Sequence, residues 1–485
     1  MVPGSVDSLH DVSTSLSDVP GLAALDSSRP TRFQFKIMFV SGMGFFTDAY
    51  DLFVIGVVVS LLKTQWHLST NQVSLLNSAT LVASAAGAII FGRIADVLGR
   101  KRIYGYEVLV LAAGAIASAL APGYVALLIF RIVLGIGVGG DYPVSATIMS
   151  EYSGKASRGR MVGLVFAMQG AGLVFGPLLA SALLASGLSH ELIWRLLLGF
   201  GAIPGLAVFY LRRQIQETPR FALAGGVAQE AEAAIAAATG QSSDAPAPAE
   251  STARVHEGAL TGALMLFSST RLVKWLIGTA LGWALLDFAY YGNSISSPAV
   301  LKLLSPHASL LQNTLLQLAI FAVFALPGYA LAIWLMDRIG RRTIQLLGFA
   351  MMAVAFFLIA AVPSVVQTAA TFLLLYGISY LFSEFGPNTT TFVYPAEIFP
   401  VQVRTTGHGI SAAAGKIGAC VGAYLFPQML ASSMGIRGAE LVAGFVSLAG
   451  LVVTAICLPE PKGRTLEELT ELSMAKHHES QAVAA

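Results

Sequence analysis

The chain has 485 residues, of which 55% are hydrophobic and only 12% are charged. Soluble domains carry about 25% charged residues, so this composition excludes an ordinary soluble protein. The formal net charge of +2 is small, and the placement of the charges along the chain is more informative than their sum.

Apolar runs of about 20 residues recur along the chain, and each can cross a hydrocarbon core about 30 Å thick. Their length, and the lack of alternating ten-residue strands in the sequence, favour helices over a barrel. The sequence therefore predicts an all-α membrane protein with twelve transmembrane helices. The expected helices cover residues 35–62, 71–95, 103–121, 124–150, 159–186, 193–211, 273–303, 311–336, 343–362, 366–396, 405–430 and 438–458.

A polar segment at 225–257, rich in Ala, Gly, Ser and Pro, separates six apolar segments from six more. This composition predicts a flexible cytoplasmic linker, with a short amphipathic helix at 229–238. Two pseudo-symmetric six-helix halves imply a substrate site near the midplane between them. The expected division is an N-terminal segment at 1–34, one half at 35–213, a linker at 214–272, a second half at 273–458 and a tail at 459–485.

Most of the 29 Lys and Arg residues lie near the even-numbered loops and the two termini. Because positive charge concentrates on the cytoplasmic side, both termini are expected in the cytoplasm of a cell-membrane protein. Residues 1–34 have no apolar core, so we do not expect a cleaved signal peptide. Cys420 and Cys457 fall inside expected helices and imply no disulfide framework.

Charged side chains interrupt several of the expected helices. A carboxylate at bilayer depth costs on the order of 2.5–3.5 kcal/mol, so such groups are expected to face a protein interior or a water-filled path. Together they indicate a solute and proton pathway through a helical bundle. The residues concerned are Asp48, Asp51, Asp141, Asp287, Glu384 and Lys416.

Asp48 and Asp51 lie three residues apart, on one face of the first expected helix. Two carboxyls so close in a low dielectric are expected to share protons, which suits a proton relay. The alternative is a structural ion pair, with Arg131 as the nearest candidate partner. In the fourth helix Asp141 and Tyr142 precede Pro143, which frees a backbone carbonyl for water or a ligand.

In the seventh helix Trp283, Asp287 and Tyr291 recur at every fourth position, along about 12 Å of helical rise. An aromatic stripe alone usually reflects packing, but the carboxylate at its centre favours a functional site. Lys416 is the only Lys deep in the second half, and its charge suits an anion. Gln169 and Asn388 are interpreted either as interhelical hydrogen-bonding groups or as ligands.

Other polar residues of the expected helices have weaker interpretations. His408, near the cytoplasmic end of the eleventh helix, is interpreted as structural or as a minor participant. Three glutamates near helix ends or breaks, which serve either gating or capping, are Glu151, Glu384 and Glu397.

The loop with Gly92, Asp96, Gly99 and Arg100 resembles the signature loop of the major facilitator superfamily. The pattern Arg131-x-x-x-Gly-x-Gly resembles its second motif, and the segments at 216–220 and 459–465 resemble those that follow helices 6 and 12 in sugar porters. A matching loop at 337–342 lacks the leading Gly. Ion pairs of Asp96 and Arg100 are expected to gate the cytoplasmic side, with Gly92 and Arg131 also assigned to the gate. The alternative is simple positive-inside anchoring.

Three segments, at 47–53, 139–151 and 404–416, resemble the phosphate:H⁺ symporters. The resemblance implies a proton route through Asp48, Asp51 and Asp141. It also implies that phosphate is surrounded by Tyr142, Gln169, Trp283, Asp287, Tyr291, Asn388 and Lys416.

Electrostatics adds Asp287 to the proton route. An ionised Asp287 beside phosphate would be repulsive by several kcal/mol at an effective dielectric near 20. Protonation removes the repulsion and creates a hydrogen-bond donor, so proton binding and anion binding favour each other.

The expected function is therefore proton-coupled import of inorganic phosphate by alternating access. The expected partners are phosphate, protons and the lipid bilayer, with a monomeric functional unit, no nucleic acid and no cofactor. An enzyme is not expected, since the sequence has no nucleophile–base pair or metal-ligand spacing at the membrane surface.

Two alternatives remain open. The first is a proton-coupled sugar or organic-acid porter. Sugar porters are expected to carry a Gln-Gln pair, then Gly and Asn, where Leu285, Leu286 and Asp287 stand. Porters of aromatic acids share the two aspartates of the first helix but not the Gly-Gly-Asp-Tyr-Pro run at 139–143. The second alternative is a phosphate-sensing receptor, against which the short, motif-poor linker and tail count.

Overall fold

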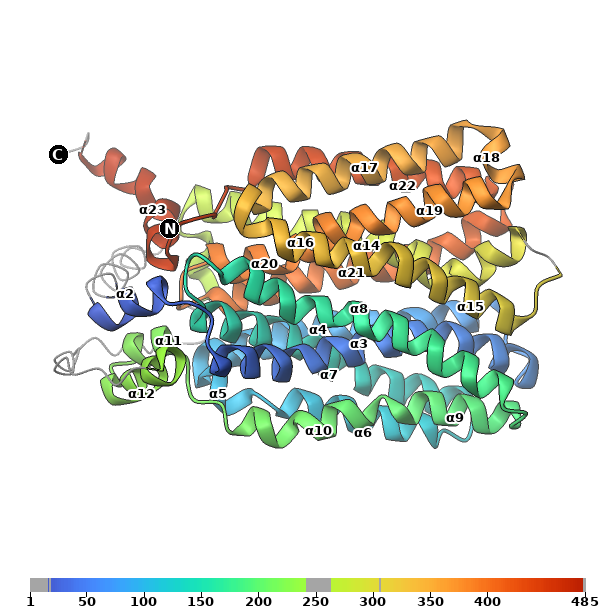
Figure 1. Ribbon diagram of the computed structural model, residues 1–485, viewed down its shortest axis with the longest axis horizontal. Coiled ribbons are helices and arrows are strands. Elements are labelled where there is room, and N and C mark those ends of the chain that lie inside the picture. Colours follow the sequence, from blue (N-terminus) through green and yellow to red (C-terminus); the bar gives the residue numbers. More distant parts are fainter. Residues whose placement is uncertain (1–15, 17–18, 241–262, 305–306, 483–485) are drawn as a thin grey trace.

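Twelve long apolar helices run side by side in the computed structural model, which describes residues 16, 19–240, 263–304 and 307–482 (Figure 1). Their length and composition suit membrane crossing, and they confirm the predicted all-α, multi-pass membrane protein. Within these described ranges the chain forms helices and no strand. Residues 241–262, the centre of the predicted linker, lie outside the described residues.

The first six spans lie between residues 32 and 213. Two of them are built from two consecutive helices. In chain order these spans are α3 (Arg32–Gln65), α4 (Thr70–Leu98), α5 with α6 (Arg100–Ile103, Tyr106–Ala119), α7 (Tyr124–Tyr152), α8 (Arg158–Ala185) and α9 with α10 (His190–Phe200, Ala202–Arg213).

The last six spans include two that contain a π-helical turn. In chain order they are α14 (Thr270–Leu304), α15 with η2 and α16 (Leu310–Ile320, Phe321–Ala325, Leu326–Ile339), α17 (Arg341–Ala361), α19 with η3 and α20 (Ala369–Ser383, Glu384–Asn388, Thr389–Ile398), α21 (Arg404–Ala431) and α22 (Gly435–Cys457).

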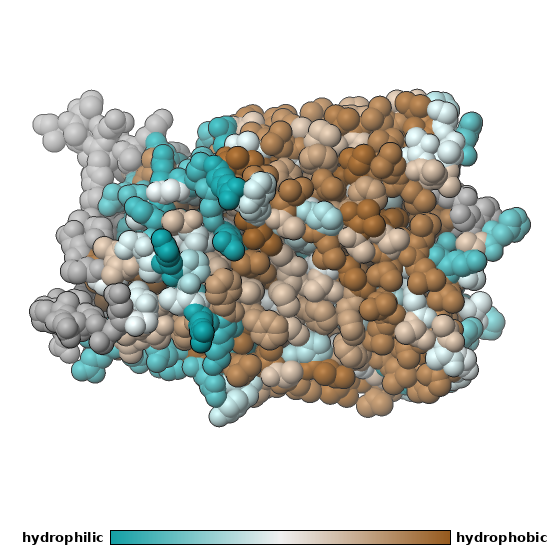
Figure 2. All heavy atoms as spheres, in the orientation of Figure 1, coloured by the Kyte–Doolittle hydropathy of each residue, from teal (hydrophilic) through white to brown (hydrophobic). Residues whose placement is uncertain are grey.

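Short helices gather at the end of the bundle where the two chain termini lie, which we call the termini end (Figure 1). Hydrophilic residues collect toward this end, while a broad hydrophobic band covers the middle of the visible face (Figure 2). One of the short helices, α12, confirms the helix expected at 229–238. The short helices at this end are α2 (Pro20–Ser27), α11 (Pro219–Ala224), α12 (Ala228–Thr239) and α23 (Leu466–Ala482).

Local signals fix where several spans begin. Thr31, Ser69 and Ser309 each form a reciprocal capping box with the glutamine three residues later, at the starts of α3, α4 and α15. Gly99 and Gly340 have φ values of +98° and +95°, which allow the sharp turns from α4 into α5 and from α16 into α17.

The two sets of spans meet closely along α4 and α21. A Cβ atom added to Gly92 on α4 would lie 2.7 Å from the carbonyl oxygen of Thr405 on α21. Glycine therefore permits backbone contact at this point. Residues from α3, α7 and α8 face residues of α14 and α21 nearby, and this is where the polar residues singled out in the sequence come together.

Candidate functional site

A buried hydroxyl group, that of Tyr142 on α7, links four helices at the centre of the bundle. It donates to the Oδ2 atom of Asp48 on α3. It accepts from Gln169 Nε2 on α8 at 2.9 Å and from Lys416 Nζ on α21 at 2.8 Å. A phenolic oxygen that donates once and accepts twice has used its hydrogen-bonding capacity. The Tyr142 hydroxyl thus joins the first and last six spans at one atom.

Lys416 is 1% exposed, yet it has several electron-rich neighbours. Its Nζ atom lies 3.8 Å from Asp48 Oδ2 and donates to the Tyr291 hydroxyl at 3.2 Å. The ammonium group also lies 4.3 Å and 5.0 Å from the ring centroids of Tyr142 and Tyr291, distances at which a cation is attracted to an aromatic face. The lysine is therefore held by two tyrosine hydroxyls and two aromatic faces, with one carboxylate near the limit of ion-pairing distance.

Asp287 on α14 faces the same centre. It interacts electrostatically with Lys416, Asp48 and Glu384, and with the Trp283 side chain one helical turn earlier. Its Oδ2 atom is buried and lacks a hydrogen-bond partner among the described residues. Asp48 Oδ1 and Glu384 Oε1 are also buried without a partner among these residues, although most buried polar atoms in proteins are paired.

A second set of polar groups extends from Gln169 into the last six spans. The Tyr329 hydroxyl on α16 donates to Gln169 Oε1 at 3.4 Å, and Asn388 Nδ2 donates to the Tyr329 hydroxyl at 3.0 Å. Asn388 Nδ2 also donates to Glu384 Oε2, one turn earlier in η3. All of these residues are at most 3% exposed.

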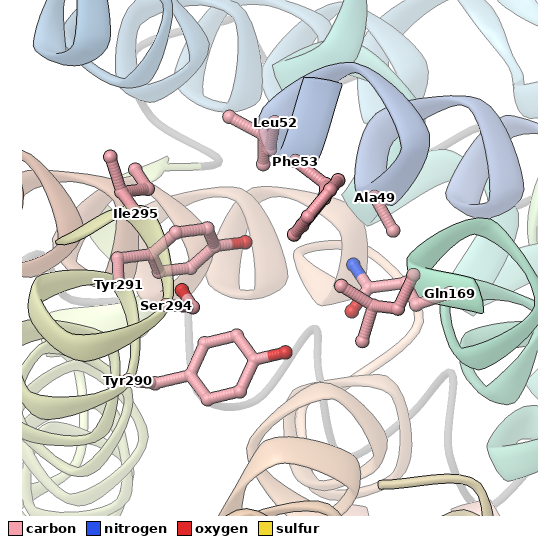
Figure 3. A pocket seen from close by; sticks show the side chains of 9 residues that line it. Ala49, Leu52, Phe53, Gln169, Tyr290, Tyr291, Ser294 and Ile295 are labelled. Carbon is pink, nitrogen blue, oxygen red and sulfur yellow. The ribbon is translucent and has the colours of Figure 1, made fainter. Parts of the chain in front are cut away.

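A narrow cavity lies beside the polar side chains around Tyr142, away from the termini end. The side chains of Tyr290 and Tyr291 reach from α14 toward Gln169 and Phe53 across it (Figure 3). Leu52, Phe53 and Ile295, which line it, follow Asp48 and Tyr291 on helices that run away from the termini end. The cluster is therefore nearly closed on this side.

Five aromatic residues, which we call the aromatic cluster, close the site toward the termini end. The ring centroids of Phe166 and Phe392 are 4.6 Å apart, and those of Phe45 and Phe392 are 4.9 Å apart. His408 contacts Phe392 and Trp283 at 5.3 Å and 5.6 Å, and its Nε2 atom lies 3.1 Å from the Phe392 carbonyl. All five side chains are at most 1% exposed, so this layer is dry.

Two of the predicted proton-route residues lie outside the group of polar side chains around Tyr142, and each is paired with an arginine. Asp51 faces Arg131 of α7, with Oδ1 and Nη1 2.6 Å apart. Asp141 accepts hydrogen bonds from Arg212 of α10 at 2.6 Å and 3.0 Å and from the Ser145 hydroxyl at 2.5 Å. Arg131 thus forms its ion pair within the first six spans.

Arg212 also contacts Glu107 of α6 at 2.9 Å, so one guanidinium bridges two buried carboxylates. Neither Arg212 nor Glu107 was identified as a site residue from the sequence. Arg212 lies just after the sixth expected helix, where a positive charge indicates only the cytoplasmic side. Glu107 could have been found, because it is a carboxylate inside an expected helix, as Asp48 is.

Ionic contacts cross between the two sets of spans near the termini end. Asp96 accepts from the backbone N–H of Thr406 at 2.6 Å and from its hydroxyl at 2.7 Å. Arg100 pairs with Asp96 at 3.0 Å and donates to the Val401 carbonyl at 2.7 Å. Glu151 pairs with Arg404 at 2.8 Å. The bundle is closed at this end by these contacts.

The loop at 337–342 forms a matching arrangement in the last six spans. Asp337 pairs with Arg341 at 2.9 Å, four residues later, as Asp96 does with Arg100. Asp337 also accepts from the backbone N–H of Arg160 at 2.9 Å, across the two sets. Arg341 pairs with Glu397 at 2.7 Å. No group of three or more His, Cys, Asp or Glu side chains with metal-binding geometry occurs in the described part of the chain.

A family model described as "Sugar (and other) transporter" matches residues 37–472. The chain therefore belongs to the sugar (and other) transporter family. Among its curated relatives in this family is the low affinity inorganic phosphate transporter 4 of Lotus japonicus, which is 36% identical over 502 residues, with 93% of this chain and 94% of the relative covered. The probable inorganic phosphate transporter 1-12 of Oryza sativa subsp. japonica is 35% identical over 509 residues, with 93% and 94% covered.

Among solved structures of transporters, the proton:xylose symporter XylE of the major facilitator superfamily, bound to 6-bromo-6-deoxy-D-glucose, matches with a TM-score of 0.77. The match covers 92% of this chain and 100% of that chain at 20% identity. This member of the sugar (and other) transporter family thus has the major facilitator fold.

Proposed function

We propose that this protein imports inorganic phosphate together with protons by alternating access. One observation supports it above the others: Lys416 lies among neutral donors and two unpaired or weakly paired carboxyls at the contact between the two sets of spans. The names of the plant relatives point to the same substrate. In this proposal phosphate binds beside Lys416 and bridges α7, α8, α14, η3 and α21.

Most of the groups proposed to hold phosphate are neutral donors, which suit an anion that must leave again. Lys416 supplies the positive charge, and Asp287 donates a hydrogen bond once it is protonated. The proposed ligands are Tyr142, Gln169, Trp283, Asp287, Tyr291, Asn388 and Lys416.

Protons enter the cycle through carboxyls that phosphate would otherwise repel. At an effective dielectric near 20, an ionised Asp287 opposes a bound phosphate by several kcal/mol. Asp48 shares Tyr142 and Lys416 with the incoming anion, so phosphate competes with it for the same partners and favours its protonation. Asp51 and Asp141 complete the proposed route, and each is held by an arginine that must move away before the carboxylate can take part.

The proposed gate is the set of contacts near the termini end around Gly92, Asp96 and Arg100. Rocking of the two sets of spans must break these contacts to release phosphate on that side. Arg131, which holds Asp51, is assigned to the same transition within the first six spans. The concentration of Lys and Arg near the termini supports a cytoplasmic location for both termini, in a cell membrane, with one chain as the transporting unit.

A proton-coupled sugar or organic-acid porter of the same superfamily is the second candidate, because the description of the family model includes sugars. A sugar is neutral and needs no cation at its site. The buried Lys416 between two tyrosine rings therefore weighs toward an anion. A receptor or an enzyme has less support, because the polar groups converge at the centre of the bundle, where two sets of spans meet.

The test is uptake of radiolabelled phosphate by proteoliposomes, with and without an inward-acid pH gradient. We expect accumulation that rises with external acidity and disappears with a protonophore. Undiminished uptake after collapse of both the pH gradient and the membrane potential would refute proton coupling. Stronger competition by glucose or by an aromatic acid than by unlabelled phosphate would favour the sugar or organic-acid alternative.

A further inference from the structure

Glu384 is a fully buried carboxyl in η3 with no cation in ion-pairing range among the described residues. Its Oε2 atom accepts from Asn388 Nδ2, while its Oε1 atom has no hydrogen-bond partner in the described chain. A buried carboxylate without a cation is costly, and its neutral form avoids that cost. The position therefore favours a carboxyl that exchanges a proton.

The elements packed against η3, which are α14, α16, α17, α19 and α20, place no cation in ion-pairing range of Glu384 among the described residues. The tyrosines Tyr290 on α14 and Tyr329 on α16 interact with it directly. Tyr380 on α19 and Asp287 on α14 are electrostatic neighbours. On α17, Gly348 packs against Gly386 and brings no titratable side chain. A negative charge on Asp287 and one on Glu384 thus oppose each other.

Asn388 links this carboxyl to the proposed phosphate site. Its Nδ2 atom has two N–H groups, and both are engaged, one with Glu384 and one with the Tyr329 hydroxyl. To donate to phosphate, Asn388 must release one of them. A hydrogen bond to a carboxylate is stronger than one to a neutral carboxyl, so an ionised Glu384 holds the amide back and a protonated one releases it.

The backbone at this point is irregular. η3 is a single π-helical turn, with Gly386 at φ −99° and ψ −116° and with Pro387 next to it. Such turns are frequent at functional sites. The Glu384–Asn388 hydrogen bond therefore joins the first and last residues of an irregular turn of the span.

We propose that Glu384 is a further proton-binding carboxyl of the transport site, whose protonation releases the Asn388 amide to bind phosphate. This rests on the proposed function. It predicts that phosphate binding and proton binding are linked through η3 as well as through the aspartates of the proposed route, so that one more proton accompanies each phosphate than those aspartates alone would supply.

The experiment measures the phosphate dissociation constant of purified wild type and Glu384→Gln over a range of pH. Linkage sets the slope of log Kd against pH by the number of protons taken up on binding, so we expect the Gln variant to lose up to about one unit of slope. Titration of phosphate itself contributes equally to the slopes of both proteins. If Glu384→Gln does not fold, Glu384→Met, which is similar in length and uncharged, gives the same readout.

Two controls make the result specific. Glu440→Gln removes another buried carboxyl of the last six spans, one that accepts a hydrogen bond from Asn293, and it is expected to leave the slope unchanged. In an Asn388→Ala background, Glu384→Gln is expected to change the slope little. Equal slopes in wild type and Glu384→Gln, or equal losses in Glu384→Gln and Glu440→Gln, would overturn the inference. Failure of wild type to bind phosphate at all would instead refute the proposed function.

Discussion

Glu217 and Glu460 bind the starts of equivalent helices in the two sets of six spans. Glu217 accepts from the backbone N–H groups of Arg100 and Lys101, both at 3.2 Å, and Glu460 accepts from those of Arg341 and Arg342 at 3.1 Å and 3.0 Å. A carboxylate at a helix N-terminus satisfies unpaired N–H groups and is favoured by the helix dipole. Burial raises the pKa of Glu217, while the Arg100 charge opposes this rise.

The glycines that precede these helix starts should resist substitution. Gly99→Ala places a side chain at φ +98°, where a Cβ would also lie 2.5 Å from Glu217 Oε2. Strain in such a backbone region costs on the order of 1–3 kcal/mol. We expect a lower melting temperature in detergent, measured by fluorescence. Gly123→Ala is the control, since its φ is −179° and no atom lies within 4 Å of the added Cβ. Equal melting temperatures in the two variants would contradict the strain argument.

Asp96→Asn should open the termini end. Asn lacks the negative charge that accepts from Thr406 and pairs with Arg100. The closed state therefore loses charge-assisted contacts that the open state does not make, and its free energy rises relative to that of the open state. Spin labels at the exposed positions Arg102 and Arg338, in a background without cysteine, should show a larger share of long distances.

Glu191→Gln is the matched control for Asp96→Asn. It removes another i,i+4 ion pair, with Arg195 at 3.1 Å, which is exposed and does not join the two sets of spans. Its distance distribution should equal that of wild type. A shift in this control as large as in Asp96→Asn would assign the change to general loosening.

Lys416→Ala should weaken phosphate binding about ten- to a hundredfold, because a charge-assisted hydrogen bond in a buried site is typically worth about 1.5–3 kcal/mol. Isothermal titration of the purified variant measures this directly. Lys416→Arg retains the charge and should bind better than the alanine variant. A folded Lys416→Ala protein with wild-type affinity would remove Lys416 from the site.

Asp287→Asn should separate binding from proton coupling. The amide resembles the protonated acid and can donate to phosphate, but it cannot release a proton. We expect retained phosphate binding with a weaker dependence on pH between about 5 and 8, together with loss of proton-driven accumulation. Asp287→Ala should weaken binding as well, since it removes the donor. Robust uptake stimulated by acid in the Asn variant would move the coupling role to Asp48, Asp51 or Asp141.

Glu467→Gln should destabilise the contact of α23 with α11. Burial alone would raise the pKa of Glu467, but the Arg220 charge and a 2.7 Å hydrogen bond hold it at about 2. Because the pKa is lower in the folded protein than the ordinary 4.5, this stabilisation is present above pH 4.5 and is lost as the pH falls toward 2.

The melting temperature of Glu467→Gln should therefore lie below that of wild type at neutral pH, and the difference should shrink between pH 4.5 and 2. Glu471→Gln, at an exposed position of the same helix, should melt like wild type throughout. A difference independent of pH would argue against an ionic role for Glu467.

The spans were predictable because hydropathy is a local property of the chain, and twelve apolar segments of sufficient length stand out in the sequence. The π-helical turn η3 was not predictable from hydropathy. Gly386 and Pro387 indicate a break there, but the break depends on the close approach of Gly348 from another span.

The side-chain directions within the site were only partly predictable. Asp48 and Asp51 lie three residues apart, so their side chains point about 60° apart around α3. That angle is enough for one to reach Tyr142 and the other Arg131. Partners such as Arg212 for Asp141 depend on how distant helices pack, which no local pattern encodes.

The aromatic cluster has a consequence for the electrical behaviour of the membrane. A layer of buried, mutually packed rings lies between the carboxyls of the site and the termini end, and it leaves hydronium ions no open path past these five side chains. With the bundle in this conformation, the protein should therefore be electrically silent: a cell that keeps many copies in its membrane without substrate would not dissipate its ion gradients through them.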